Sequence, residues 1–155
     1  MPEEISLRKA TEADVPELLR HRRGMFLDMG ETDAAALDKM EAGAGPLIAR
    51  GLREGFFHAW LALTPERRVV GGGAVHLPLY PASTRELKER RPCILNVFVD
   101  AEFRRKGVAR RLMEEMVGWC RTEGYASVYL HASEQGRPLY ISMGFEPTNE
   151  MRLDL

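Results

Sequence analysis

The sequence has little of what marks a secreted, disulfide-bonded or membrane-spanning protein. Its 155 residues include two cysteines, Cys93 and Cys120, which lie far apart and indicate no disulfide framework. No run approaches the roughly 20 consecutive apolar residues that cross a bilayer. Residues 1–4 lack both the basic start and the apolar core of a signal peptide. We therefore expect a cytoplasmic protein that does not act on a membrane.

An excess of charge of one sign is also lacking. With 22 Lys and Arg against 23 Asp and Glu, the net charge is -1, which argues against the broad positive surface of a nucleic-acid-binding module. The four histidines and two cysteines show no spacing typical of metal ligands, so we expect no metal. The Gly-x-Ser-x-Gly motif of many hydrolases is absent. Any positive field must therefore be local.

What the sequence does contain predicts one domain over residues 1–155. A chain that is 45% hydrophobic and of this length can bury a cooperative core without disulfides or metals. The first third predicts a strand near Ile5 and Leu7 and a helix that stops at Gly30. A second helical stretch follows over residues 32–55. It is interrupted near Pro46, which predicts either a bend or a boundary between two short helices.

The remaining two thirds alternate strands with helices. Residues 71–73, three consecutive glycines inside one strand, indicate a bulge or a close approach of the backbone. The mixture of hairpins and crossover helices predicts an α+β sheet with helices on its faces. An exposed last strand would also be able to pair two subunits in a homodimer. The expected elements are strands at 57–63 and 69–77, a long loop at 79–91, a central strand at 93–99, a helix at 107–123, a strand at 127–131, a short helix at 136–143 and a last strand at 151–155.

The turn at residues 104–109 is the most informative segment. An apolar strand runs into Arg-Arg-Lys-Gly-Val-Ala and straight on into a helix. Free N–H groups at a helix start, beside a glycine that lets the backbone approach, form an anion cradle. The side chains of Arg104, Lys106 and Arg110 can add positive charge. Neither Gly-x-Gly-x-x-Gly nor Gly-x-x-x-x-Gly-Lys-Ser/Thr occurs. From the residues alone, a phosphate-binding turn and an ordinary solvated basic turn are equally acceptable.

Two motifs carry a resemblance to a known family. Asn96-Val97-Phe98-Val99-Asp100, followed by Arg-x-x-Gly-x-Ala and an amphipathic helix, resembles the acetyl-CoA signature of the GNAT superfamily of N-acetyltransferases. Residues 133–145, with Leu-Tyr and then Gly-Phe, resemble its second motif. The resemblance is strong over residues 93–146 and agrees in element order over nearly the whole chain. It implies a mixed, mostly antiparallel sheet with a central parallel splayed strand pair and helices on both faces.

The resemblance implies acetyl-CoA as co-substrate, with its pantetheine arm lying in the gap of the splayed pair. Ser133 stands where the family often has an asparagine that touches this arm. The implied cofactor-binding residues are Val97, Phe98 and Val99 for the arm, Arg105, Gly107, Val108 and Ala109 for the pyrophosphate, and Arg104, Lys106 and Arg110 for added charge.

The implied reaction is direct attack of a primary amine of a small molecule or peptide on the thioester, in a ternary complex. The amide of Val97 would stabilise the oxyanion, and Tyr140 would protonate the CoA sulfur, unless it is a packing aromatic. Many relatives have a glutamate where this chain has Leu95. The general base is therefore either His76, unless it is an ordinary strand histidine, or Glu31, unless it is a solvated turn acid.

The acceptor is expected to lie among apolar walls and one or two acids, which suit a cationic amine. The residues expected around it are Phe26, Met29, Gly30, Glu31, Tyr80 and the loop at 79–91. Without the usual glutamate, the alternative is a catalytically degenerate CoA-binding regulatory domain.

Overall fold

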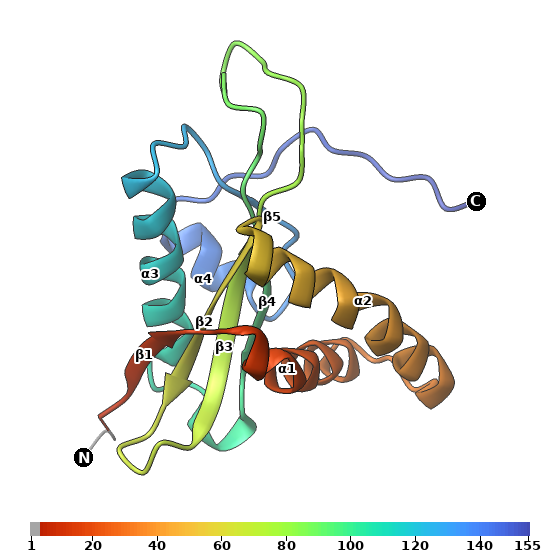
Figure 1. Ribbon diagram of the computed structural model, residues 1–155, viewed down its shortest axis with the longest axis vertical. Helices are drawn as coiled ribbons and strands as arrows, with labels where there is room; N and C mark the ends of the chain where they lie inside the picture. Colours follow the sequence, from red (N-terminus) through yellow and green to blue (C-terminus); the bar gives the residue numbers. More distant parts are fainter. Residues whose placement is uncertain (1–3) are drawn as a thin grey trace.

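The computed structural model describes residues 4–155, which build one sheet of five strands in the order β1-β2-β3-β4-β5 (Figure 1). The first four strands are antiparallel to their neighbours, whereas β4 and β5 are parallel. This arrangement confirms the expected α+β sheet. The strands are β1 (Ser6–Lys9), β2 (Phe57–Leu63), β3 (Val69–His76), β4 (Cys93–Val99) and β5 (Tyr129–Leu130).

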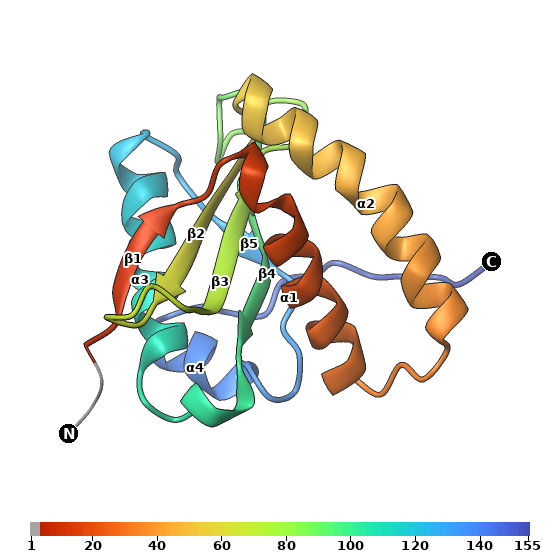
Figure 2. The ribbon, with the colours of Figure 1, turned by 60° about the horizontal axis from the view of Figure 1, so that its bottom comes forward.

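Helices cover both faces of this sheet. Helices α1 (Val15–Asp28) and α2 (Ala34–Glu54) lie on one face (Figure 2). Helices α3 (Val108–Thr122) and α4 (Arg137–Ser142) lie on the other. Each pair has its own apolar core. Burial of the α3 face on the sheet follows from the amphipathic pattern that predicted the helix.

The expectation of a boundary between two short helices near Pro46 was wrong. Helix α2 runs without interruption for 21 residues, with Pro46 inside it. A proline inside a helix costs about 3 kcal/mol or more. Burial of Leu37 and Ile48, each worth about 1.5–3 kcal/mol, offsets that cost. Tertiary packing therefore overrides the local signal.

The irregularity expected at residues 71–73 is present, but the extra residue belongs to β4. Leu95 lies opposite Ala74 and Phe98 lies opposite Gly72, so that Asn96 and Val97 both face the one residue between, Gly73. Two residues opposite one define a β-bulge. We call Asn96 and Val97 the bulge.

The last strand expected at residues 151–155 does not form. Those residues have no strand structure and are exposed throughout. A strand needs a partner edge, and this segment leads away from the sheet (Figure 1). The parallel pair β4–β5 consequently lies at one edge of the described sheet, with β3 in its middle. None of the helices within residues 4–155 combines the length and apolarity that crossing a bilayer requires.

Candidate functional site

The parallel strands β4 and β5 separate soon after they meet. They pair at Cys93 with Tyr129 and at Ile94 with Leu130, after which β5 ends while β4 continues to Val99. Among residues 4–155, no further strand pairs with this side of β4. An exposed strand edge presents N–H and C=O groups that can bind an extended ligand as an added strand. The open edge of β4 is the first part of the candidate site.

The bulge lies in the middle of this open edge. Asn96 has a φ of 62°, in the left-handed region that non-glycine residues seldom adopt. Its buried side-chain amide donates a hydrogen bond of 2.9 Å to the carbonyl of Leu18 in α1. A bulge leaves one residue of the strand out of the hydrogen-bond ladder. Helix α1 thus holds the backbone in a conformation that can direct the Val97 amide away from β3.

His21 holds the same region from α1. Its ring is fully buried and stacks on Phe98, with 5.5 Å between the ring centroids. Burial, together with the nearby Arg20, lowers the pKa of His21 to about 4, so the imidazole is neutral at pH 7. A Cβ on Gly72 would lie 2.8 Å from its Nδ1 atom, so this close approach of helix and strand requires glycine. Sequence analysis assigned His21 no role.

The segment that follows β4 has the backbone geometry of an anion-binding turn. We call residues 104–110 the basic turn. Two of its residues, Arg105 at φ 60° and Gly107 at φ 81°, adopt left-handed conformations. Helix α3 begins directly after Gly107. The first N–H groups of a helix have no intrahelical acceptor, and alternating backbone conformations make a concave nest of N–H groups. The turn therefore places the first N–H groups of α3 at the positive end of a helix dipole.

Two side chains of the basic turn bind other parts of the protein. The Arg104 guanidinium donates to the Asp28 carboxylate at 2.7 Å and to the Val99 carbonyl at 2.8 Å. Arg110 donates to the Ser142 hydroxyl of α4 at 2.7 Å. These contacts hold the turn between α1, β4 and α4. Sequence reasoning missed the Asp28 contact because the two residues lie 76 positions apart.

Tyr140 lies on α4 and is half-buried. Its ring packs on the Phe145 ring in a T-shaped arrangement, with 6.0 Å between the ring centroids. Burial raises the pKa of its phenol above the usual value of 10.0, so the hydroxyl keeps its proton at pH 7. Together with Cys93 and Leu130, it lines a cavity of about 480 Å³, which we call the edge cavity. A protonated phenol at the point where β4 and β5 part is suited to donate a proton.

Ser133 acts within its own segment. Its hydroxyl accepts the N–H of Gly136 at 3.1 Å, and its carbonyl accepts the N–H of Arg137 at 3.0 Å. Both bonds help to begin α4. The side chain that the resemblance placed on the cofactor arm thus already has a partner in the fold.

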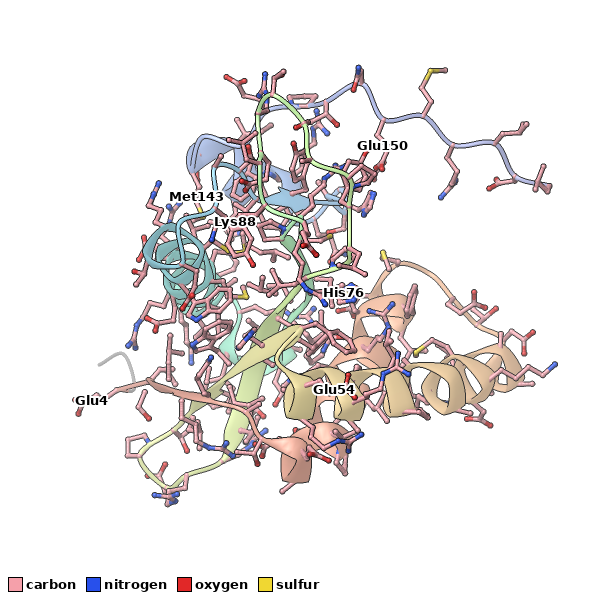
Figure 3. All side chains as sticks on the ribbon, turned by 45° about the horizontal axis from the view of Figure 1, so that its top comes forward. Glu4, Glu54, His76, Lys88, Met143 and Glu150 are labelled. Carbon is pink, nitrogen blue, oxygen red and sulfur yellow. The ribbon has the colours of Figure 1, made fainter. Side chains whose placement is uncertain are left out.

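The two candidate bases do not meet at the bulge. His76 ends β3 opposite Cys93, between the end of α2, marked by Glu54, and the loop of residues 79–91 (Figure 3). At about 3.3 Å per residue, Cys93 lies about 13 Å along β4 from Val97. Burial and the nearby Arg90 and Arg22 lower the pKa of His76, so its ring is neutral at pH 7.

Glu31 lies in the exposed turn between α1 and α2. Its carboxylate accepts the backbone N–H groups of Thr32 at 3.1 Å and Asp33 at 2.9 Å. It therefore stabilises the turn that leads into α2. Residues 4–155 also contain no group of three or more His, Cys, Asp or Glu side chains that would bind a metal ion.

The edge cavity carries both charge signs, since Arg91 and Arg137 line it together with Glu146 and Glu150. The Arg91 guanidinium stacks over two tyrosine rings: its Cζ atom lies 3.5 Å from the ring centroid of Tyr129 and 4.8 Å from that of Tyr80. All three side chains line the edge cavity. Across the same cavity His131 bonds Glu150. Both charge signs are thus present, and most of these groups already contact one another.

Comparison with known proteins bears on this geometry. Residues 80–154 match the family model described as an acetyltransferase (GNAT) domain. Human N-acetyltransferase 8 is 33% identical over 94 residues, which are 59% of this chain and 39% of that protein. The chain thus spans only about two fifths of the length of that relative.

Solved structures match over nearly the whole chain. A GCN5-related N-acetyltransferase from Ralstonia eutropha JMP134 superposes with a TM-score of 0.91 and 29% identity, covering 98% of this chain and 99% of that one. A predicted acetyltransferase with acetyl-CoA from Clostridium acetobutylicum gives a TM-score of 0.86 at 23% identity, covering 98% and 96%. The fold, the family model and these relatives agree with the two sequence motifs. Residues 80–154 thus carry an acetyltransferase (GNAT) domain, and the whole chain has the fold of GCN5-related N-acetyltransferases.

Proposed function

We propose that this protein transfers the acetyl group of acetyl-CoA to a primary amine of a small molecule or peptide. One observation carries the proposal: an open strand edge with a left-handed bulge is followed, after a short 3-10 helix at Ala101–Phe103, by the basic turn at the start of α3. An extended thiol arm that ends in a pyrophosphate matches this succession of backbone groups. The known acetyl-CoA complex of a protein with the same fold supports the assignment of the donor.

The donor is bound mainly through the backbone. The pantetheine arm pairs with the edge at Val97 and Val99, while the Phe98 side chain faces α1 and packs on His21. The pyrophosphate accepts N–H groups of Arg105 and the first residues of α3, Val108 and Ala109. Gly107 permits the left-handed turn between them. Lys106 adds charge, whereas Arg104 and Arg110 mainly hold the turn in place.

In the reaction, the amine nitrogen attacks the thioester carbonyl carbon and forms the new C–N bond. The Val97 N–H stabilises the developing oxyanion. The C–S bond then breaks, and the Tyr140 hydroxyl gives its proton to the leaving thiolate. Holding both substrates side by side removes much of the entropic barrier, an effect worth up to about 7–11 kcal/mol.

The incoming amine must also lose a proton, since an alkyl ammonium has a pKa of about 10. Leu95 provides no base, and Glu31 is engaged in its turn. His76 is neutral, but Cys93, which lies opposite it, is about 13 Å along β4 from Val97. We therefore assign proton removal to ordered water. Of the two candidate bases, only His76 is free, and it would receive the proton at the far end of a chain of water molecules.

Because no base lies beside the bulge, a second function is considered: a CoA-binding regulatory domain without catalysis. Release of free thiol from acetyl-CoA, measured with polyamines, amino acids, aminoglycosides and peptide N-termini, separates the two. Amine-dependent thiol release supports the enzyme. Binding of acetyl-CoA without turnover on any amine would instead support the regulatory domain, and absence of binding would contradict both.

A further inference from the structure

The three arginines of helix α1 differ in what they bind. Arg20 and Arg23 each donate to two carboxylates, at distances between 2.7 and 3.0 Å. Arg22 lies between them in the sequence and is half-buried, yet it bonds no carboxylate among residues 4–155. Its Nε atom is buried and has no hydrogen-bond acceptor in that part of the chain. Arg22 is thus the arginine of α1 whose charge the fold leaves unpaired.

An unpaired, half-buried charge lowers the stability of a fold. Burial lowers the pKa of the Arg22 guanidinium, and no acid acts against that shift. The group nevertheless stays charged at pH 7, because the pKa of arginine starts so high. Its side chain packs on Phe26, with 5.4 Å between Cζ and the ring centroid. A cost of this kind, with no compensating partner in the fold, is typical of a residue that binds a ligand.

A second arginine lies near the same place. Arg22 and Arg90 both lie close enough to His76 to lower its pKa, and no carboxylate acts in the opposite direction. The Cζ atom of Arg90 lies 5.8 Å from the ring centroid of Phe56, and that ring lies 6.2 Å from the His76 ring. A hydrogen bond to the Leu77 carbonyl fixes the Arg90 guanidinium there. We call Arg22 and Arg90 the arginine pair.

The arginine pair borders the candidate active site. His76 lies opposite Cys93, and Cys93 lines the edge cavity. Helix α1, which carries Arg22, also holds the bulge through the hydrogen bond from Asn96 to Leu18, one turn before Arg22. Helices α1 and α2 cover this face of the sheet, whereas the basic turn leads into α3 on the other face (Figure 2). An acceptor that approaches the bulge from the α1 face therefore passes the arginine pair.

We propose, resting on the function proposed above, that the acceptor carries a carboxylate besides its amine, and that Arg22 and Arg90 bind this carboxylate. The substrate class is then amino acids or short peptides with a free carboxyl end. A guanidinium binds a carboxylate through two parallel N–H donors, and the acid would supply the acceptor that the Arg22 Nε lacks. A polyamine, in contrast, meets charge of its own sign here.

Matched acceptors test the carboxylate. Thiol release from acetyl-CoA is measured with phenylalanine and phenethylamine, and with the dipeptide alanyl-phenylalanine and its C-terminal amide. Because hydrogen bonds to charged groups are strong, we expect kcat/KM to be about tenfold or more higher for the acid-bearing member of at least one pair. Equal or higher values for the acid-free member of both pairs overturn the proposal.

Variants of the arginine pair locate the contact. Arg22→Met and Arg90→Met should each raise KM for the preferred acid about tenfold and leave kcat/KM for its acid-free partner unchanged. The control Arg23→Met, whose guanidinium binds Asp38 and Glu41, should keep the preference. Since Arg22 has no carboxylate partner among residues 4–155, Arg22→Met should not lower Tm. A preference that survives in Arg22→Met, or an equal loss for both members of a pair, contradicts the proposal.

Binding of a product separates this test from that of acetyl transfer. Isothermal titration with N-acetyl-phenylalanine and with its amide, with and without CoA, requires no turnover. Tighter binding of the acid, lost in Arg22→Met, supports the carboxylate site even if no amine is acetylated, in which case the proposed function alone fails. Equal affinity for the acid and the amide, or binding of neither, contradicts the carboxylate site even if amines are acetylated.

Discussion

The basic turn and the edge cavity border the same splayed strand pair, yet they present different chemistry. At the basic turn, the groups available to a ligand are backbone N–H groups, beside two left-handed residues and at the start of α3. At the edge cavity, the surface consists of side chains from distant segments, such as the stack of Arg91 between Tyr80 and Tyr129. In our proposal, local backbone geometry binds the donor, whereas the acceptor site depends on contacts across the fold.

The largest expected effect belongs to Tyr140, which lies between the two regions. Tyr140→Phe removes the proton donor, and general acids contribute about 100-fold or more to a rate. We expect kcat to fall about 100-fold with the affinity for acetyl-CoA unchanged. Since burial raises the phenol pKa, loss of the Tyr140 proton should lower the rate of the unmodified protein only above pH 10, whereas protonation of the amine lowers the rate on the acid side. Steady-state thiol release measures both. Unchanged turnover in Tyr140→Phe would remove its role as acid.

A substitution at Gly107 tests the proposed acetyl-CoA site directly. Gly107→Val places a β-branched side chain at a φ of 81°, a strain of about 1–3 kcal/mol, which corresponds to a roughly 5- to 150-fold loss of acetyl-CoA affinity. Isothermal titration measures this loss. The control is Gly118→Ala in the middle of α3, where an added Cβ meets nothing within 4 Å. If Gly107→Val binds acetyl-CoA as tightly as Gly118→Ala does, the backbone of the turn does not form the site.

Substitutions at Asn96 in the bulge should have a smaller effect on stability. They distinguish the left-handed backbone conformation from the hydrogen bond to Leu18. Asn96→Ala removes the bond to Leu18 and places an ordinary residue at a left-handed φ, a cost of about 1–2 kcal/mol for the φ alone. Asn96→Gly removes the same bond without that strain. We expect urea unfolding to rank alanine below glycine by about 1 kcal/mol, and kcat to follow that order. Equal stability of the two variants would show that the left-handed conformation is not required.

Arg104 should have the smallest effect. Its ion pair with Asp28 is partly exposed, and such pairs contribute about 0–1 kcal/mol. Arg104→Gln should therefore weaken acetyl-CoA binding less than about fivefold. Asp28→Asn should weaken it by a similar amount, because both changes remove the same ion pair. A loss above tenfold in Arg104→Gln alone would show that the guanidinium binds phosphate itself.

The same contrast explains how far sequence reasoning reached. Runs of apolar, aromatic and β-branched residues predicted β2 to β4, and helical periodicity predicted α1 and α3, because these elements bury most of their apolar side chains. Pro46 misled because burial on the sheet outweighs its local cost, and residues 151–155 misled because a strand requires a partner edge. The motif placed the basic turn and Tyr140. It could not place the bonds from Arg104 to Asp28 or from Asn96 to Leu18, since such contacts join segments about 76 to 78 residues apart.

We propose that the open β4 edge and the basic turn together bind acetyl-CoA. Thermal unfolding with acetyl-CoA and with S-acetyl-pantetheine, which lacks the pyrophosphate, tests it most directly. A ligand at 100 times its Kd stabilises the folded state by about 2.7 kcal/mol. We predict that saturating acetyl-CoA raises Tm, that S-acetyl-pantetheine at the same concentration raises it much less, and that Gly107→Val removes most of this difference. Equal stabilisation by the two ligands would show that the basic turn does not bind the pyrophosphate, and no stabilisation by acetyl-CoA would show that neither region binds it.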